Sequence, residues 1–209
     1  TYLSSSNNLT GQTITVNPQD TITYIITAQN ASGCGDQMEY FIDILPAPNI
    51  NVTSLSPSVC QGDMVPVSAS GAVSYSWYPS LGLNTNIGST VNATPLITTD
   101  YKVVGVGSNG CKDSSQITIN SLPLPILNVT GSNVICEGES VSLSVSGANT
   151  YIWSPSTSLN TTIGNSVLAN PVSSQTYNIT GTDLNNCEGN TSFSITVLPS
   201  PSISITASK

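Results

Sequence analysis

The residues of this 209-residue sequence whose type and spacing could do chemistry are its five cysteines. They are Cys34, Cys60, Cys111, Cys136 and Cys187. The sequence has no His, so it cannot build a Ser-His-Asp or Cys-His nucleophilic arrangement. Its carboxylates stand singly in predicted turns. We therefore expect no enzyme, and we expect the cysteines to form disulfides in an oxidising, secreted setting.

The charge of the sequence excludes two further classes of function. The formal net charge is −8, and the only cations are Lys102, Lys112 and Lys209. Such a chain cannot neutralise a phosphate backbone, so we expect no nucleic-acid partner. It also lacks the basic patches that dock on anionic lipid. No apolar run approaches the roughly 20 residues of a membrane span, and we expect no membrane insertion.

The cysteines belong to an internal repeat with a period of 76 residues. Cys60-Gln-Gly returns as Cys136-Glu-Gly, and Tyr75-x-Trp77-x-Pro79 returns as Tyr151-x-Trp153-x-Pro155. The first part of the chain carries the end of the same unit, because Tyr24 and Cys34 match Tyr101 and Cys111 at an offset of 77. A fixed period of this length is typical of repeat architectures.

We therefore divide the sequence into four segments. Residues 1–48 are the C-terminal part of a repeat, 49–125 and 126–201 are complete repeats, and 202–209 begin a further one. We expect the sequence to be an excerpt of a longer polypeptide. Alternatively, a strand from another subunit completes the first unit, as in donor-strand assembly.

Apolar residues alternate with a period of two within each unit, as in Val65-x-Val67-x-Ala69, and no stretch has helical spacing with a cap. In the first complete unit we expect strand A near 50–59, B near 64–70, C near 74–78, F near 100–106 and G near 115–121. About seven short strands per unit predict an all-β fold of tandem immunoglobulin-like (PKD-like) antiparallel sandwiches.

The aromatic residues of the repeat allow two interpretations. Trp77 and Trp153 stand on predicted strand C, and Tyr101 and Tyr177 stand at the start of predicted strand F. Tryptophan can also stack on sugars, but one Trp per unit in an alternating strand favours packing in the core. We expect all four to be core residues.

The Cys-x-Gly, Tyr-x-Trp-x-Pro, Thr-Tyr-x-Ile/Val and Asn-Gly/Asn-Cys elements resemble the PKD-like and immunoglobulin-like repeats of large Bacteroidota surface proteins. That family includes gliding-motility adhesins exported by the type IX secretion system. True PKD domains carry a Trp-x-Phe-Gly-Asp-Gly-like run, and Trp77-Tyr-Pro-Ser and Trp153-Ser-Pro-Ser replace it here. Any role tied to that run therefore does not carry over.

The strand assignment bears on which cysteines pair. Within one unit, Cys60 and Cys111 fall at opposite ends of a strand of about seven residues, roughly 20 Å or more apart, whereas bridged Cα atoms lie within about 7 Å. In a head-to-tail array, Cys60 meets Cys187 of the next unit, and we prefer this inter-repeat pair. The alternative pairs Cys60 with Cys111 and Cys136 with Cys187. Short Pro-x-Pro linkers are stiff, and they favour a rod.

No cofactor is expected. An alternative hypothesis places Ca²⁺ at a repeat junction, held by Asp63, Asp183 and Glu188, although no multi-Asp loop is present. Asp20-Thr21-Ile22 resembles the Bacteroidota O-glycosylation signal, so the resemblance implies Thr21 as a modification site.

These observations predict the stalk or filament of a secreted bacterial cell-surface adhesin, with a mechanical role. Two alternatives stay open: a subunit of a self-assembling extracellular fibre with strand exchange, and a string of carbohydrate-binding modules on a secreted hydrolase. The expected partners are neighbouring repeats, other copies in a filament, surface glycans and outer-membrane motility machinery.

Overall fold

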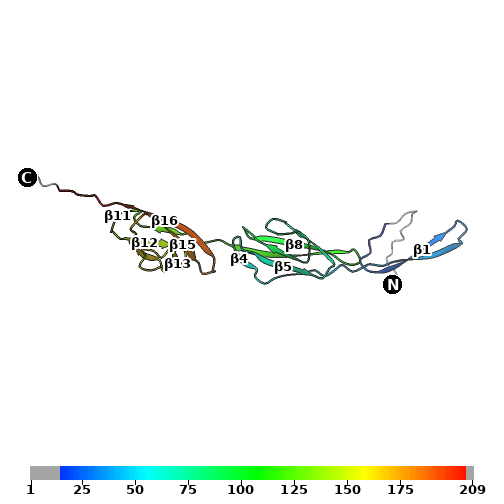
Figure 1. The fold of residues 1–209 in the computed structure, drawn as a ribbon. Helices are drawn as coiled ribbons and strands as arrows, with labels where there is room; N and C mark the ends of the chain where they lie inside the picture. Colours follow the sequence, from blue (N-terminus) through cyan, green and yellow to red (C-terminus); the bar gives the residue numbers. More distant parts are fainter. Residues whose placement is uncertain (1–14, 206–209) are drawn as a thin grey trace, which may run out of the picture.

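A computed structural model describes residues 15–205 of the chain, which form sixteen β-strands and no helix. The strands make a hairpin, β1–β2, and two sandwiches that follow it along the chain (Figure 1). We call them the first sandwich, β3–β9, and the second sandwich, β10–β16. The ends of the sequence, 1–14 and 206–209, lie outside the described residues, as do parts of the first and last predicted segments.

The first sandwich consists of a three-stranded and a four-stranded sheet. The three-stranded sheet has the order β3-β5-β7 and the four-stranded sheet the order β4-β9-β8-β6. In the usual lettering these are strands A-B-E and A′-G-F-C of an immunoglobulin-like sandwich. Their bounds are β3 Asn51–Ser54, β4 Ser58–Cys60, β5 Val65–Ser70, β6 Ser74–Tyr78, β7 Thr90–Ala93, β8 Thr99–Val106 and β9 Lys112–Leu122.

The second sandwich repeats this topology strand for strand. Its sheets have the orders β10-β12-β14 and β11-β16-β15-β13. The fold class is therefore all-β and immunoglobulin-like, as the alternating sequence predicts. The bounds are β10 Asn128–Thr130, β11 Val134–Cys136, β12 Val141–Ser146, β13 Thr150–Ser154, β14 Ser166–Ala169, β15 Gln175–Thr182 and β16 Glu188–Leu198.

Alternation along the strands produces one core in each sandwich. In β5 and β12 every second residue, from Val65 and from Val141, is buried, while the residues between them are exposed or half-buried. Because successive side chains of a strand point to opposite faces, one face of each sheet becomes apolar and packs on the other sheet. The two buried clusters share no residue.

The expected single strand A near 50–59 is wrong in one respect. The structure divides it into β3, which pairs antiparallel with β5, and β4, which pairs in parallel with β9. The segment between them contains Pro57, which has no backbone N–H to donate to a ladder. As a result, one segment contributes an edge strand to each of the two sheets.

The hairpin contains β1 (Ile22–Gln29) and β2 (Gly35–Ile42), paired in register from Ile22↔Ile42 to Gln29↔Gly35. By the repeat offset its strands match strands F and G of a complete unit. No other strand of the described residues pairs with it. Its apolar side chains are therefore much more exposed than their counterparts, with Ile26 at 52% and Val103 at 0%.

Candidate functional site

Two of the five cysteines form a disulfide where the two sandwiches meet. Cys60 at the end of β4 and Cys187 just before β16 form a disulfide, with a Cα–Cα distance of 5.5 Å and a sequence separation of 127. The bond joins the first sandwich to the second. The structure contains neither bond of the alternative pairing, Cys60 with Cys111 or Cys136 with Cys187.

Cys60 is positioned by the strand that leaves the first sandwich. β4 pairs in parallel with the end of β9, so that Cys60 faces Leu122, and the backbone N–H of Gln61 donates to the Leu122 carbonyl at 2.8 Å. The linker to the second sandwich starts directly after Leu122. The disulfide and the linker therefore connect the two sandwiches at the same end of the first one.

Cys187 is held by a tight turn that Asp183 closes. The Asp183 Oδ1 atom accepts hydrogen bonds from the backbone N–H of Asn185 at 2.8 Å and of Cys187 at 2.9 Å. The Asp183 N–H donates to the Cys187 carbonyl at 3.0 Å. This is the local use of Asp in turns, in which its side chain bonds backbone N–H groups a few residues on. These hydrogen bonds fix the position of Cys187, which is fully buried.

The linker itself packs against the second sandwich. A Cβ atom added to Gly189 in β16 would collide with the backbone carbonyl oxygen of Pro125. Only glycine allows the linker backbone to approach this closely. One junction is therefore fixed by a covalent bond and by close backbone contact.

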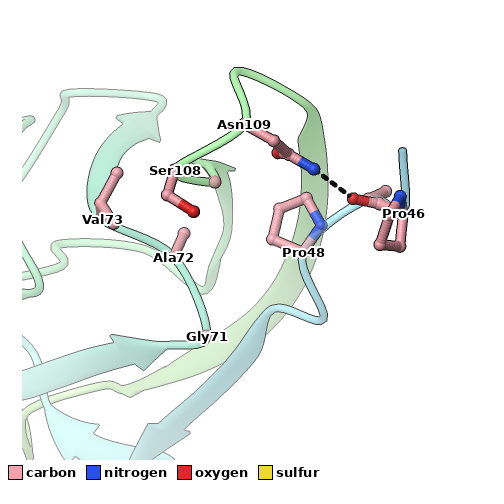
Figure 2. Close-up of a pocket in the computed structure, with 9 residues that line it drawn as sticks. Pro46, Pro48, Gly71, Ala72, Val73, Ser108 and Asn109 are labelled. Atoms are coloured by element: carbon pink, nitrogen blue, oxygen red, sulfur yellow. Dashed lines mark hydrogen bonds between the residues drawn. The ribbon is translucent and has the colours of Figure 1, made fainter. Parts of the chain in front are cut away.

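A second contact zone lies where the hairpin leads into the first sandwich. The Asn109 side-chain NH₂ donates to the Pro46 carbonyl at 2.9 Å, across a shallow hollow of about 420 Å³ beside Ala72 and Pro48 (Figure 2). Asn109 Oδ1 also accepts the Cys111 N–H at 3.1 Å, and the Cys111 Sγ donates to the Leu45 carbonyl at 3.7 Å. Cys111 matches Cys187 in the repeat, so the same turn faces a linker in both sandwiches.

Three cysteines are free thiols in the structure. Cys34 and Cys136 are exposed, and Cys111 is half-buried. Cys136 ends β11 as Cys60 ends β4, and Cys34 and Cys111 occupy the position of Cys187. Each free cysteine therefore lies at an end of its sandwich or hairpin.

The four predicted aromatic residues lie inside the sandwiches. Trp77 and Tyr101 are 0% exposed, and Trp153 and Tyr177 are 1% and 0% exposed. The Trp77 indole N–H donates to the Gly88 carbonyl at 2.9 Å, and the Trp153 indole N–H donates to the Gly164 carbonyl at 3.0 Å. These rings offer no surface to a sugar, and each polar atom has a partner inside the protein.

The two core tyrosines share one arrangement. The Tyr101 hydroxyl donates to the Leu81 carbonyl at 3.0 Å, and the Tyr177 hydroxyl donates to the Thr157 carbonyl at 3.2 Å. Burial raises the pKa of both phenols above the usual value, and a hydrogen bond with Thr99 lowers that of Tyr101 by less. Each tyrosine ties strand F to the segment after strand C.

The residues proposed for Ca²⁺ form no such site within residues 15–205, where no three His, Cys, Asp or Glu side chains gather. Asp183 instead closes the Cys187 turn. The same part of the chain forms no helix long and apolar enough to cross a membrane. Thr21 is exposed, and its hydroxyl donates to Asp43 at 2.9 Å and accepts the Ile44 N–H at 3.0 Å.

Sequence reasoning missed the roles of Asn109 and Asp183. Both lie in the turn between strands F and G, a few residues before a cysteine. Both accept a hydrogen bond from the backbone N–H of that cysteine through a side-chain oxygen. A repeated polar residue two or four positions before each cysteine was the signal that could have found them. The pattern is harder to see because the residue type and the spacing differ between the two units.

No family model matches the sequence, and no curated protein matches it. Among solved structures, it is similar to an adhesin with which an Antarctic bacterium binds ice, at 14% identity and a TM-score of 0.40, covering 85% of this chain and 57% of that one. It is similar to the insect immune protein hemolin at 16% identity and a TM-score of 0.39, covering 85% and 56%. The Yersinia pseudotuberculosis adhesin InvE gives 14% identity and a TM-score of 0.28, covering 70% and 58%. These similarities are weak, and the immunoglobulin-like assignment rests on the strand order described above.

Proposed function

We propose that this chain is a structural repeat region, the stalk or filament of a secreted bacterial cell-surface adhesin, with a mechanical rather than a catalytic role. The observation that carries the proposal is the Cys60–Cys187 bond between two successive sandwiches. Inter-domain contacts within a chain usually leave the domains mobile relative to each other. A covalent bond beside a proline-containing linker removes most of that freedom and favours a stiff, head-to-tail rod.

The free cysteines support extension of the same pattern along a longer array. In this proposal Cys136 pairs with the strand F–G cysteine of a following unit, and Cys34 and Cys111 pair with cysteines of preceding units. Each complete unit would then carry one bond at each end. The exposed position of Cys136 at the end of β11 is what such a bond requires.

We further propose that the adhesin is of the gliding-motility type of Bacteroidota, which is exported by type IX secretion. This assignment is supported by the sequence resemblance of the repeats. An extracellular setting agrees with the disulfide, because such bonds persist in oxidising compartments. Surface glycans and the motility machinery are the partners that this assignment implies.

Small-angle X-ray scattering of the oxidised chain tests the mechanical role. We expect one extended maximum dimension that does not change with temperature below unfolding. Cys60→Ser should broaden the distance distribution, whereas Cys136→Ser, which removes a free thiol, should leave it unchanged. Equal distributions for all three proteins would contradict a stiffening role of the bond.

A second candidate function, a fibre subunit with strand exchange, is favoured by the hairpin. Ile26 and Tyr40 of the hairpin are 52% and 58% exposed, on strands that match the core-facing strands F and G of a complete unit. Strands donated by another copy would cover this face. Light scattering after size-exclusion chromatography should then show assemblies, and Ile26→Asn should dissociate them. A monomer at all concentrations would contradict strand exchange.

A further inference from the structure

The first sandwich has an apolar hollow at the end that carries Cys60. Its volume is about 310 Å³, and its lining includes Leu81, Pro95, Leu96 and Ile97. The side chains of Leu81, Leu96 and Ile97 are 72%, 67% and 67% exposed. Large aliphatic side chains gathered at one exposed place usually mark a contact surface.

The hollow lies directly beside the disulfide. Gly62 lines it and is two residues from Cys60. The Gly62 N–H donates to the Pro95 carbonyl at 3.2 Å, and the Gln61 side chain donates to the Leu96 carbonyl at 2.9 Å. The turn that follows the bridging cysteine is therefore bonded to one wall of the hollow.

An exposed leucine lies on the other side of the same bond. Leu184 belongs to the turn that presents Cys187, and its residue surface is 84% exposed. It is three residues from Cys187, so their Cα atoms are at most about 11 Å apart. The turn is closed by the Asp183–Cys187 backbone bond, which brings Leu184 closer to the disulfide than that limit.

The two repeats differ both at the position of the leucine and at the positions that line the hollow. The residue of the first sandwich that matches Leu184 is Ser108. In the second sandwich, Thr157 and Ser173 replace Leu81 and Ile97, while Val172 replaces Leu96. Of the two sandwiches, the second has the leucine at this turn and the first has the more apolar hollow, and both features lie at the Cys60–Cys187 junction.

We propose that Leu184 seats in the hollow formed by Leu81, Pro95, Leu96 and Ile97, and so locks this junction in a second, closed arrangement. The structure holds the open arrangement, in which Leu184 and the hollow are both exposed. The disulfide keeps the turn beside the hollow, and in this proposal only the turn that carries Leu184 moves, because the bond and the linker contact hold the two sandwiches in place. Burial of these aliphatic surfaces favours the closed arrangement. The inference concerns the junction and holds whether or not the chain is part of an adhesin stalk.

Disulfide trapping in the full chain tests this inference. In a background in which Cys34, Cys111 and Cys136 are replaced by Ser, Leu184→Cys is combined with Ile97→Cys. The matched control combines Leu184→Cys with Met64→Cys, because Met64 is 64% exposed, is four residues from Cys60 and does not line the hollow. We expect the Ile97 pair to form at least about tenfold faster, because seating raises the effective concentration of the two thiols.

Three outcomes would overturn the inference: equal trapping rates, no trapping of the Ile97 pair, or trapping only between two chains. A second measurement does not depend on new cysteines. Methyl-labelled wild-type protein should show nuclear Overhauser effects between Leu184 and Leu96 or Ile97, and Ile97→Ser, which introduces the residue of the second sandwich, should abolish those of Leu184. Absence of these effects in the wild type would equally overturn it.

Discussion

Cys60 and Cys187 are bonded across 127 positions, although each sandwich has a separate buried core. The bond lies outside both cores, at the point where the linker leaves the first sandwich. It therefore restricts the motion of one sandwich relative to the other. It also lowers the conformational entropy of a sandwich that unfolds while the other stays folded. This effect on unfolding has a measurable consequence.

Removing the bond should destabilise the sandwich that does not contain the mutation. When the second sandwich unfolds beside a folded first one, the disulfide ties its chain into a loop from near Leu122 to Cys187. A loop of this size lowers the entropy of the unfolded state, an effect typically worth about 2–4 kcal/mol. Cys60→Ser should therefore lower the urea midpoint reported by Trp153 fluorescence in a Trp77→Phe background.

The control for this experiment is Cys136→Ser. Cys136 lies within the second sandwich but is an exposed free thiol, so its replacement should leave the Trp153 transition in place. An equal shift for both substitutions would mean that the bond has no special effect. Peptide mapping without reduction provides the direct check, with Cys60 and Cys187 expected in one cross-linked fragment.

Truncation of a core tryptophan should unfold one sandwich selectively. Trp77 is fully buried, and loss of a buried Trp side chain typically costs about 3–5 kcal/mol. In Trp77→Ala the remaining tryptophan, Trp153, reports only the second sandwich, and its transition should move much less than far-ultraviolet circular dichroism of the whole chain. Coincident shifts of both signals would show that the two cores are not independent.

The sequence predicts the strands well because the alternation of apolar residues is imposed by burial on one face. Strand B, expected near 64–70, is Val65–Ser70 in the structure, and strand C is Ser74–Tyr78 as expected. The division of strand A into β3 and β4 could not be predicted. The alternation of apolar residues shows which side chains point inward, but it does not show which of the two sheets the strand pairs with. The role of Asp183 in closing the turn before Cys187 could not be predicted for a related reason. Its role depends on side-chain hydrogen bonds across four residues that have no hydrophobic signature.

The core tyrosines should make the stability of the protein fall at alkaline pH. Burial raises the pKa of Tyr101 and Tyr177 in the folded protein above the value of about 10 that an unfolded tyrosine has. The unfolded chain then loses these protons first as pH rises. The stabilisation is complete below about pH 10 and is lost above it, as pH approaches the folded pKa values.

Urea unfolding at about pH 9 and about pH 11 measures this effect on either side of the tyrosine pKa. The double variant with Tyr101→Phe and Tyr177→Phe should lose part of the decrease. It should also be less stable at about pH 9, since each lost hydroxyl hydrogen bond typically costs about 1 kcal/mol. The exposed Tyr78, replaced by Phe, is the matched control. An undiminished alkaline decrease in the double variant would assign it to other groups.

A methyl group at Gly189 should loosen the junction from the linker side. The added Cβ would collide with the Pro125 carbonyl oxygen, a backbone atom that cannot move without shifting the whole linker. Overpacking of this kind typically costs about 1–3 kcal/mol. Gly189→Ala should therefore lower the Trp153 urea midpoint and should make the Cys60–Cys187 bond easier to reduce by dithiothreitol. The repeat supplies the control, because the matching residue in β9 is Asp113, which already carries a side chain. Asp113→Ala should leave both measurements unchanged, and equal effects of the two alanines would refute a special role for the contact with Pro125.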